Sequence, residues 1–299
     1  MFSNERMFLQ VISSVLIFAF VPLAIKYTNA TPLTICLFRI LITVITLSVI
    51  WRNKIDFKSF SPKASGGFKL WLLGFVFFCH WLTYAYAVKM GGAGVGVIGL
   101  STYGIQLVAA GTIFLGHKIS KKDIFLFIFS LIGLYMVIPS WNFHNDITRG
   151  LIFALLSASF FAALPIINRK SQEFSLETRI FAQFFGACVF LLFFISQTSW
   201  NLLAIDWLVL LFLAIFGTLL AHSLWAKISA TLSPSITGLT YYAIAPITLL
   251  FSAIFLHEKF SLNQLAGAFL IIGSAVVNIL TEYSKKSVMM KVEIKNQAD

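Results

Sequence analysis

The chain has 299 residues, of which 59% are hydrophobic and only 11% are charged, with 32 phenylalanines. Ordinary globular proteins are roughly 45–50% apolar and about 25% charged, so this composition, with a mean hydropathy of +0.90, excludes a soluble protein. The net charge of +11 would suit a nucleic-acid-binding protein, until the basic residues are placed along the chain.

In chain order, ten mostly apolar stretches each approach the length of about 20 residues that crosses roughly 30 Å of hydrocarbon. They are expected at 7–27, 33–51, 70–89, 92–116, 122–140, 148–168, 176–197, 207–227, 235–256 and 262–282. The connections between them are short, and the longest, 52–69, carries turn signals at Ser61-Pro62 and Gly66-Gly67. The first stretch is expected to remain as a span, since nine more follow it. The sequence therefore predicts an all-α membrane protein with ten transmembrane helices.

The basic residues set the expected orientation. With the N-terminus inside, 17 of the 22 lysines and arginines fall in cytoplasmic segments, and Arg39 lies within a span. The outer side holds Lys26, Lys89, Arg149 and Lys259. The positive-inside rule then places both termini in the cytoplasm, and nucleic acid is excluded as a partner. The three cysteines lie in apolar stretches at a spacing that matches no metal site, so neither a disulfide nor a bound metal is expected.

Four short segments recur in the same order about 140 residues later, which indicates an internal repeat. The pairs are 18–22 with 161–165, 80–82 with 222–224, 99–103 with 238–242, and 113–120 with 254–261. Each repeat holds five spans, an odd number, so the second copy enters the membrane from the opposite side. We expect a first five-helix repeat over 1–145, a second, inverted one over 146–282, and a cytoplasmic tail over 283–299. Inverted repeats are typical of secondary transporters.

The first half carries four residues at a characteristic spacing, Pro22, Lys26, Pro32 and Arg39, and the second half carries a proline and a glutamate twelve residues apart at 246 and 258. This pattern resembles the EamA-type family of the drug/metabolite transporter superfamily, over the chain to about residue 282. The resemblance implies ten helices in a bacterial inner membrane, around a cavity lined by spans one to four and six to nine. It also implies cargoes such as amino acids, other small metabolites or drugs.

Two histidines lie deep within spans, where ionisable groups are costly and often functional. His80 is near the middle of the third span with Tyr84 one turn later, and its repeat mate His222 has Trp225 three residues on. A two-fold axis would bring both histidines towards one central site. The alternative is that each is packed against a neighbouring helix. None of the eleven carboxylates lies near a span centre, so proton coupling would need a histidine.

Arg39 must find a partner inside the membrane, and two roles stay open for it: binding a substrate carboxylate with both arms of its guanidinium, or holding the bundle together. Aromatic rings with polar tips suit an amphipathic ligand. The proposed substrate-binding set is His80, Tyr84, Tyr103, Gln106, His222, Trp225, Tyr241 and Tyr242, with Pro22 and Pro165 as symmetric flex points.

The sequence as a whole predicts a secondary transporter that moves a small metabolite, preferably an amino acid or similar zwitterion, by alternating access. Its partners would be that small molecule and the lipid bilayer, with no catalytic residue and no cofactor, and a homodimer stays open. One alternative keeps the transport and changes the cargo to drugs or nucleotide-like metabolites. Another is a non-transporting membrane scaffold or an intramembrane enzyme.

Overall fold

The computed structural model describes residues 5–61, 64–116, 120–137, 142–231 and 241–298, and all regular secondary structure within them is helical. The expected all-α class is therefore confirmed for this part of the chain. The helices of the first half are α1 (Glu5–Tyr27), α2 (Pro32–Ile50), η1 (Phe57–Phe60), α3 (Gly67–Gly91), α4 (Ala93–Leu100), α5 (Tyr103–Leu115) and α6 (Lys121–Val137). Those of the second half are α7 (Asp146–Arg169), α8 (Leu176–Leu192), η2 (Ile195–Gln197), α9 (Ala204–Ala214), η3 (Ile215–Leu220), α10 (Ala221–Thr231), α12 (Ile244–Phe255) and α13 (Leu262–Ala298).

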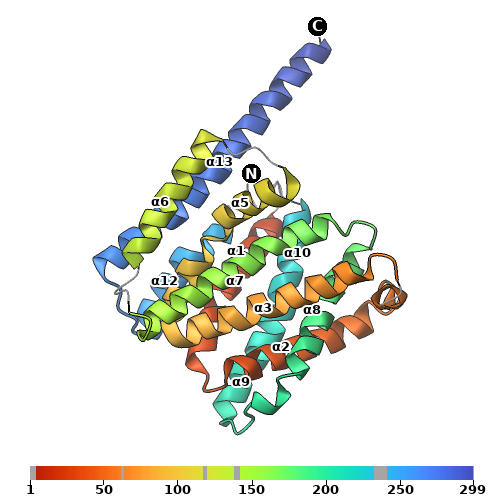
Figure 1. Cartoon of the computed structure of the whole chain (residues 1–299), viewed down its shortest axis with the longest axis vertical. Helices are drawn as coiled ribbons and strands as arrows, with labels where there is room; N and C mark the ends of the chain where they lie inside the picture. Colours follow the sequence, from red (N-terminus) through yellow and green to blue (C-terminus); the bar gives the residue numbers. More distant parts are fainter. Residues whose placement is uncertain (1–4, 62–63, 117–119, 138–141, 232–240, 299) are drawn as a thin grey trace.

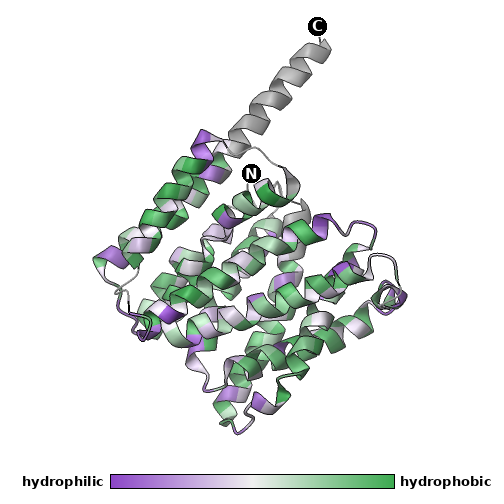
Figure 2. Ribbon diagram, in the orientation of Figure 1, coloured by the Kyte–Doolittle hydropathy of each residue, from purple (hydrophilic) through white to green (hydrophobic). Residues whose placement is uncertain are grey.

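Among the described residues, six helical segments are long and apolar enough to cross a membrane. These are Arg6–Tyr27, Pro32–Ile50, Gly67–Gly91, Ala93–Phe114, Asp146–Arg169 and Ala204–Trp225, and two shorter apolar helices cover Ile244–Phe255 and Leu262–Asn278. Hydrophobic residues fill the middles of the helices and hydrophilic ones gather at their ends (Figure 2). Large apolar side chains also face outwards, as on α6, where Ile124, Phe125, Ile128 and Leu131 are exposed. Such an outer surface suits lipid rather than water.

Several expected boundaries differ from the structure. The span predicted at 92–116 consists of two helices, because α4 ends at Leu100 and α5 begins at Tyr103. Ser101 and Thr102 occupy the break, and their hydroxyls donate to the carbonyls of Val97 at 2.8 Å and Gly99 at 2.7 Å. An apolar pattern alone does not reveal such a break, because these short polar side chains satisfy the backbone locally.

Two further differences concern the second half. The span predicted at 207–227 contains a turn of π-helix, η3. The residues after 282, expected as a separate tail, continue α13 as far as Ala298, and this end of the helix projects beyond the bundle (Figure 1). Residues 235–240 of the ninth predicted span and 138–140 of the fifth lie outside the described residues.

Contacts between helices fix their relative directions. α1 and α3 run the same way, because they pack against each other and their last turns meet, where the Lys26 ammonium donates to the carbonyl of Lys89 at 2.9 Å. α3 and α7 run in opposite directions, because His80 contacts Ser157 while Gly91, later in α3, lies against Gly150, earlier in α7. The first helices of the two halves, α1 and α7, are therefore antiparallel.

Glycines let α3 pack closely against two helices of the second half. A methyl group on Gly150 would lie 2.5 Å from the Cα of Gly91, and one on Gly74 would lie 2.5 Å from the Cα of Gly186 in α8. Real carbon atoms do not approach so closely, so any side chain at these positions would push the helices apart. α3 thus packs backbone to backbone on α7 near one end and on α8 near the other. The largest hydrophobic cluster fills the space between α2, α3 and α8 around Ile40, Leu73 and Phe181.

Candidate functional site

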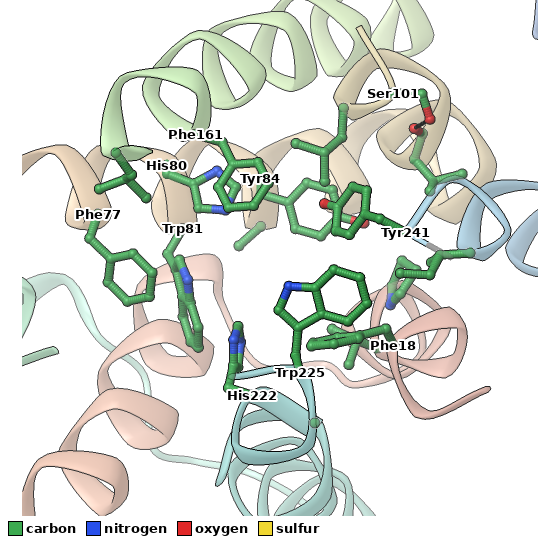
Figure 3. Close-up of a pocket in the computed structure, with 18 of the residues that line it drawn as sticks. Phe18, Phe77, His80, Trp81, Tyr84, Ser101, Phe161, His222, Trp225 and Tyr241 are labelled. Atoms are coloured by element: carbon green, nitrogen blue, oxygen red, sulfur yellow. Dashed lines mark hydrogen bonds between the residues drawn. The ribbon is translucent and has the colours of Figure 1, made fainter. Parts of the chain in front are cut away.

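A cavity of about 310 Å³ lies between helices of both halves. Its lining comes from α1, α2, α3, α4, α7, α8, η3, α10 and α12 and from Tyr241 and Tyr242, which precede α12. Many residues of the wall are aromatic: Phe18, Phe77, Trp81, Tyr84, Phe161, Trp225 and Tyr241, which Figure 3 labels, and Tyr242. The volume falls at the lower end of the range of roughly 300–1,000 Å³ for small-molecule sites.

Irregular points in several helices surround this cavity. Pro22 in α1 and Pro165 in α7 both line it, and each removes one amide from the helical hydrogen-bond ladder. Ser101, in the break between α4 and α5, also lines it. In the second half, Ala243 forms a turn directly before α12, and it lies 142 residues after Ser101. Each half is thus interrupted beside the same cavity, directly before α5 in the first half and directly before α12 in the second.

Most of the predicted site residues meet at this cavity. Nine of the eleven line it: Pro22, Arg39, His80, Tyr84, Pro165, His222, Trp225, Tyr241 and Tyr242. They come from both halves of the chain, as the repeat predicts. Tyr103 and Gln106 are not in the lining, although both lie on α5 next to it.

Tyr103 and Gln106 instead support the wall from behind. The Tyr103 ring packs on Phe161, with centroids 4.6 Å apart, and on Tyr241 at 5.9 Å. The Gln106 amide donates to Thr102 Oγ1 at 2.8 Å and accepts from Ser159 Oγ at 2.6 Å. The amide is therefore already used in joining α5 to α7. In this structure Gln106 is therefore not placed to contact a ligand in the cavity.

His80 is held firmly by α7. Its Nδ1 lies 2.8 Å from Ser157 Oγ and 3.1 Å from the Ser157 carbonyl oxygen. Its ring stacks on Phe161, with centroids 4.7 Å apart and an interplanar angle of 18°. Only 8% of the residue is exposed. The ring is thus fixed within its plane by Ser157 and perpendicular to it by Phe161.

His222 faces the same cavity without a hydrogen bond to any described residue. Its ring meets Phe18 edge to face at 5.2 Å and lies nearly parallel to Trp81 at 6.1 Å. In Figure 3, His80 and His222 lie on different sides of the cavity, with Trp81 next to His222. The two histidines therefore share one cavity, as expected from the repeat, but their surroundings differ.

Arg39 is 5% exposed, and no carboxylate of the described residues lies within ion-pair distance of it. Its Nε donates to Thr218 Oγ1 at 3.0 Å, and its guanidinium carbon lies 4.3 Å from the centroid of the Trp81 ring. Thr218 belongs to the π-helix η3, where its hydroxyl donates to the carbonyl of Leu213, five residues earlier, at 2.8 Å. The wider turn presents Thr218 to Arg39, which joins α2 to η3 at the cavity wall. Arg39 thus holds two helices together, which is the structural role considered for it, and it also lines the cavity.

Several aromatic residues of the wall are not among those that the sequence singled out: Phe18, Phe77, Trp81 and Phe161. A signal existed for two of them, because Phe18 and Phe161 open the recurring segments that end in Pro22 and Pro165. Phe77 and Trp81 could not be singled out, because aromatic residues are abundant in a chain with 32 phenylalanines.

Two carboxylates form hydrogen bonds between the two halves of the protein at one end of the helix bundle. Glu258, after α12, accepts from the backbone amides of Ala93 at 2.7 Å and Gly94 at 2.9 Å, at the start of α4. Asp206, in the first turn of α9, accepts from Thr28 Oγ1 at 2.9 Å and from the amide of Asn29 at 2.7 Å. Carboxylates are favourable at helix N-termini, where amides lack partners within the helix. Both contacts join the first half to the second.

Comparisons with known proteins agree with this organisation. The model of the EamA-like transporter family matches residues 6–138 and 148–280, so the matched stretches begin 142 residues apart. One solved structure, titled only "Crystal structure of protein", superposes with a TM-score of 0.61 at 16% identity, over 93% of this chain and 98% of the other. At that identity the likeness shows a shared fold. No curated protein matches the chain.

Proposed function

This chain belongs to the EamA-like transporter family, and from that premise we propose that it is a secondary transporter moving a small metabolite across the bacterial inner membrane by alternating access. The favoured cargo is an amino acid or a similar zwitterion. The observation that carries the proposal is the aromatic cavity built jointly by two repeats of the chain. A site at the interface of two repeats is the usual place for the cargo of a secondary transporter.

The proposed architecture is ten membrane helices in two inverted repeats of five. The antiparallel directions of α1 and α7 support this arrangement. The pattern of helix neighbours supports it as well, because α1 packs on α10 and α12 while its counterpart α7 packs on α3 and α5. Exchanging the halves turns one set of neighbours into the other.

The cavity chemistry supports a cargo with an anionic end. Arg39 is the charged residue in the described lining, and no carboxylate is among the lining residues. A cation would find no counter-charge in this wall, whereas a carboxylate could approach the guanidinium. The aromatic rings would cover the apolar part of the cargo. The same chemistry disfavours the alternative of cationic drugs.

Alternating access would be a rocking of one half of the protein against the other. Pro22 and Pro165 lie inside α1 and α7 at the cavity, where a missing amide permits a helix to bend. They are the proposed flex points. The carboxylates of Glu258 and Asp206 would have to leave their partners when the end of the bundle that they fasten opens.

Uptake into proteoliposomes tests the transport function. The twenty standard amino acids are first screened one at a time for thermal stabilisation of the purified protein, and those that stabilise it are used radiolabelled. We expect uptake that the double variant His80→Ala/His222→Ala abolishes and that His144→Ala, an exposed histidine away from the cavity, leaves unchanged. Uptake untouched by the double variant would refute the site. Absence of both stabilisation and uptake, for amino acids and then for nucleotides and drugs, would favour the scaffold.

Cysteine labelling tests the topology and orientation separately. Asn201 and Gln172 are exposed positions before α9 and after α7, and each would be changed to cysteine in a chain without Cys36, Cys79 and Cys188. A reagent that cannot cross membranes should label Asn201→Cys from the periplasm. It should label Gln172→Cys only in everted vesicles. Labelling of both from one side would mean that α8 does not cross the membrane, and the reverse pattern would contradict the expected orientation of the second half.

A further inference from the structure

The hydrogen bonds of His80 determine which of its two ring nitrogens carries the proton. A carbonyl oxygen can only accept, so the Ser157 carbonyl at 3.1 Å requires a hydrogen on Nδ1. The Ser157 hydroxyl donates its own proton to the His80 carbonyl at 3.0 Å, which leaves its lone pairs free for Nδ1 at 2.8 Å. In the neutral ring, Nε2 then carries a lone pair and no proton.

This Nε2 makes no hydrogen bond to any described residue, while His80 lines the cavity. Around it the wall is aromatic, with Phe161 stacked on the ring and Tyr84 nearly parallel to it at 6.4 Å (Figure 3). An acceptor in such a wall is costly to leave unpaired once the cavity closes on a cargo.

We propose that His80 recognises a hydrogen-bond donor of the cargo, such as an ammonium group, through Nε2, and that Ser157 is the positioning residue that keeps this nitrogen an acceptor. The inference rests on the proposed transport function. It gives the cavity two groups of opposite preference, since a carboxylate is repelled by the Nε2 lone pair and attracted by Arg39. His80 thereby selects the end of the cargo that it meets.

Nitrogen NMR of the purified protein tests the protonation state without any cargo. The protein is labelled with ring-¹⁵N histidine, and the His80 signals are identified by their loss in His80→Gln. We expect a protonated Nδ1 and an unprotonated Nε2 at neutral pH. A proton on Nε2, in either the other tautomer or the imidazolium, would overturn the proposal even if the protein transports amino acids.

Two variants and three aromatic probes then test the recognition itself. His80→Gln can restore an acceptor near the position of Nε2, and His80→Asn can restore only the bond to Ser157. The probes are L-phenylalanine, phenethylamine and 3-phenylpropanoate, which share a ring and differ in their ammonium and carboxylate. We expect His80→Asn to weaken binding of the two amines about tenfold or more and His80→Gln to weaken it less, with 3-phenylpropanoate affected little by either.

Equal losses for all three probes, or rescue by Asn and not by Gln, would mean that His80 serves only the packing of α3 on α7. If the wild-type protein binds none of the probes, phenylalanine and compounds like it are excluded as the cargo. The NMR result would still decide the state of His80.

A second proposal comes from a buried hydroxyl without a partner. Ser14 in α1 is fully buried, and its Oγ makes no hydrogen bond to any described residue. Ser14 precedes Phe18 by four residues and Pro22 by eight, and Ser157 stands in the same relation to Phe161 and Pro165. Ser14 is therefore the repeat mate of Ser157. Ser157 is bonded to a histidine, whereas Ser14 is unpaired.

We infer that Ser14 bonds His222 in the opposite conformation of the transport cycle, as Ser157 bonds His80 in this one. His222 already packs on Phe18, one turn from Ser14, and has no hydrogen bond to a described residue. In inverted repeats, the two halves exchange conformations between the two states. An unpaired buried hydroxyl costs free energy here, which gaining His222 as a partner would remove in the other state.

Thiol labelling in the cavity tests this exchange without a cargo. Ser101→Cys, in a chain without the native cysteines, reports access from each side in right-side-out and everted vesicles. Adding Ser157→Ala should shift the labelling rates towards one side, and adding Ser14→Ala should shift them about two- to tenfold towards the other. Ser274→Ala, which removes a bond within α13 only, should leave them unchanged.

The thermal stability of the variants gives a second readout. Ser14→Ala should leave the melting temperature unchanged or raised, because it deletes a hydroxyl that is unpaired in this state. If Ser14→Ala and Ser157→Ala shift the labelling rates towards the same side, or if Ser14→Ala leaves the labelling rates unchanged, the exchange is overturned. The transport function and the role of His80 would both still stand.

Discussion

Phe161 of the second half stacks on His80 of the first, with centroids 4.7 Å apart, and the exchanged pair repeats this contact: Phe18 of the first half packs on His222 of the second, at 5.2 Å. The angle between the rings is 18° in one pair and 79° in the other. The two contacts are thus equivalent in sequence and different in geometry. This is the relation expected of repeats that occupy two distinct conformations at one time.

Glu258→Gln should destabilise the protein. The substitution removes the charge that strengthens two hydrogen bonds from the start of α4, to the amides of Ala93 and Gly94. We expect a loss of about 1–3 kcal/mol, measured as a lower melting temperature in detergent. The control is Glu173→Gln, which removes an exposed ion pair to Lys69 and should cost less than about 1 kcal/mol. Equal effects of the two variants would contradict the role given to Glu258.

The ion pair removed in the control variant Glu173→Gln should make a small, pH-dependent contribution to the stability of the protein. The ammonium of Lys69 donates to Glu173 and lowers the pKa of that carboxyl group. Because the folded pKa is below the unfolded one, the stabilisation is present above the ordinary range of a glutamate and is lost as the pH falls through the folded pKa. The difference in melting temperature between the wild-type protein and Glu173→Gln should therefore shrink on acidification. A difference that grows would show that Glu173 acts otherwise.

Gly150→Ala should force α3 and α7 apart. A methyl group there would lie 2.5 Å from Gly91, and overpacking of this kind costs about 1–3 kcal/mol. Gly273→Ala in α13 is the matched control, because nothing lies within 4 Å of its added carbon. That variant should be neutral or stabilising by about 0.5–1 kcal/mol, since alanine favours a helix over glycine. The melting temperatures of the two variants should move in opposite directions.

Thr218→Val should uncouple Arg39 from the π-helix. The change keeps the shape of the side chain and removes the acceptor of the Arg39 Nε proton, so a buried donor is left unpaired at a cost of about 1–3 kcal/mol. In Thr46→Val the lost bond goes only to a carbonyl of the same helix, that of Ile42, and the cost should be within about 0.5 kcal/mol. Equal melting temperatures for the two variants would show that Arg39 does not depend on Thr218.

The all-α fold, the repeat and nine residues of the cavity lining could be predicted from the sequence. Long apolar stretches have to cross the bilayer as helices, and polar residues deep within them are costly unless they face a cavity or a partner. The repeat spacing placed His80 and His222 at one cavity. The position of Gln106 could not be predicted, because the sequence does not show that its side-chain amide is hydrogen-bonded to Ser159 on another helix. The π-helix around Thr218 could not be predicted either, because one wider turn does not change the apolar pattern of the span.

The close glycine contacts of α3 have a consequence for how the protein can be divided. α3 belongs to the first repeat by sequence, yet its backbone rests on α7 and α8 of the second. Severing the chain between residues 138 and 148 would consequently not release two self-sufficient modules. Each fragment would present bare glycine grooves to lipid, and co-expression of the two should be needed before either resists proteolysis.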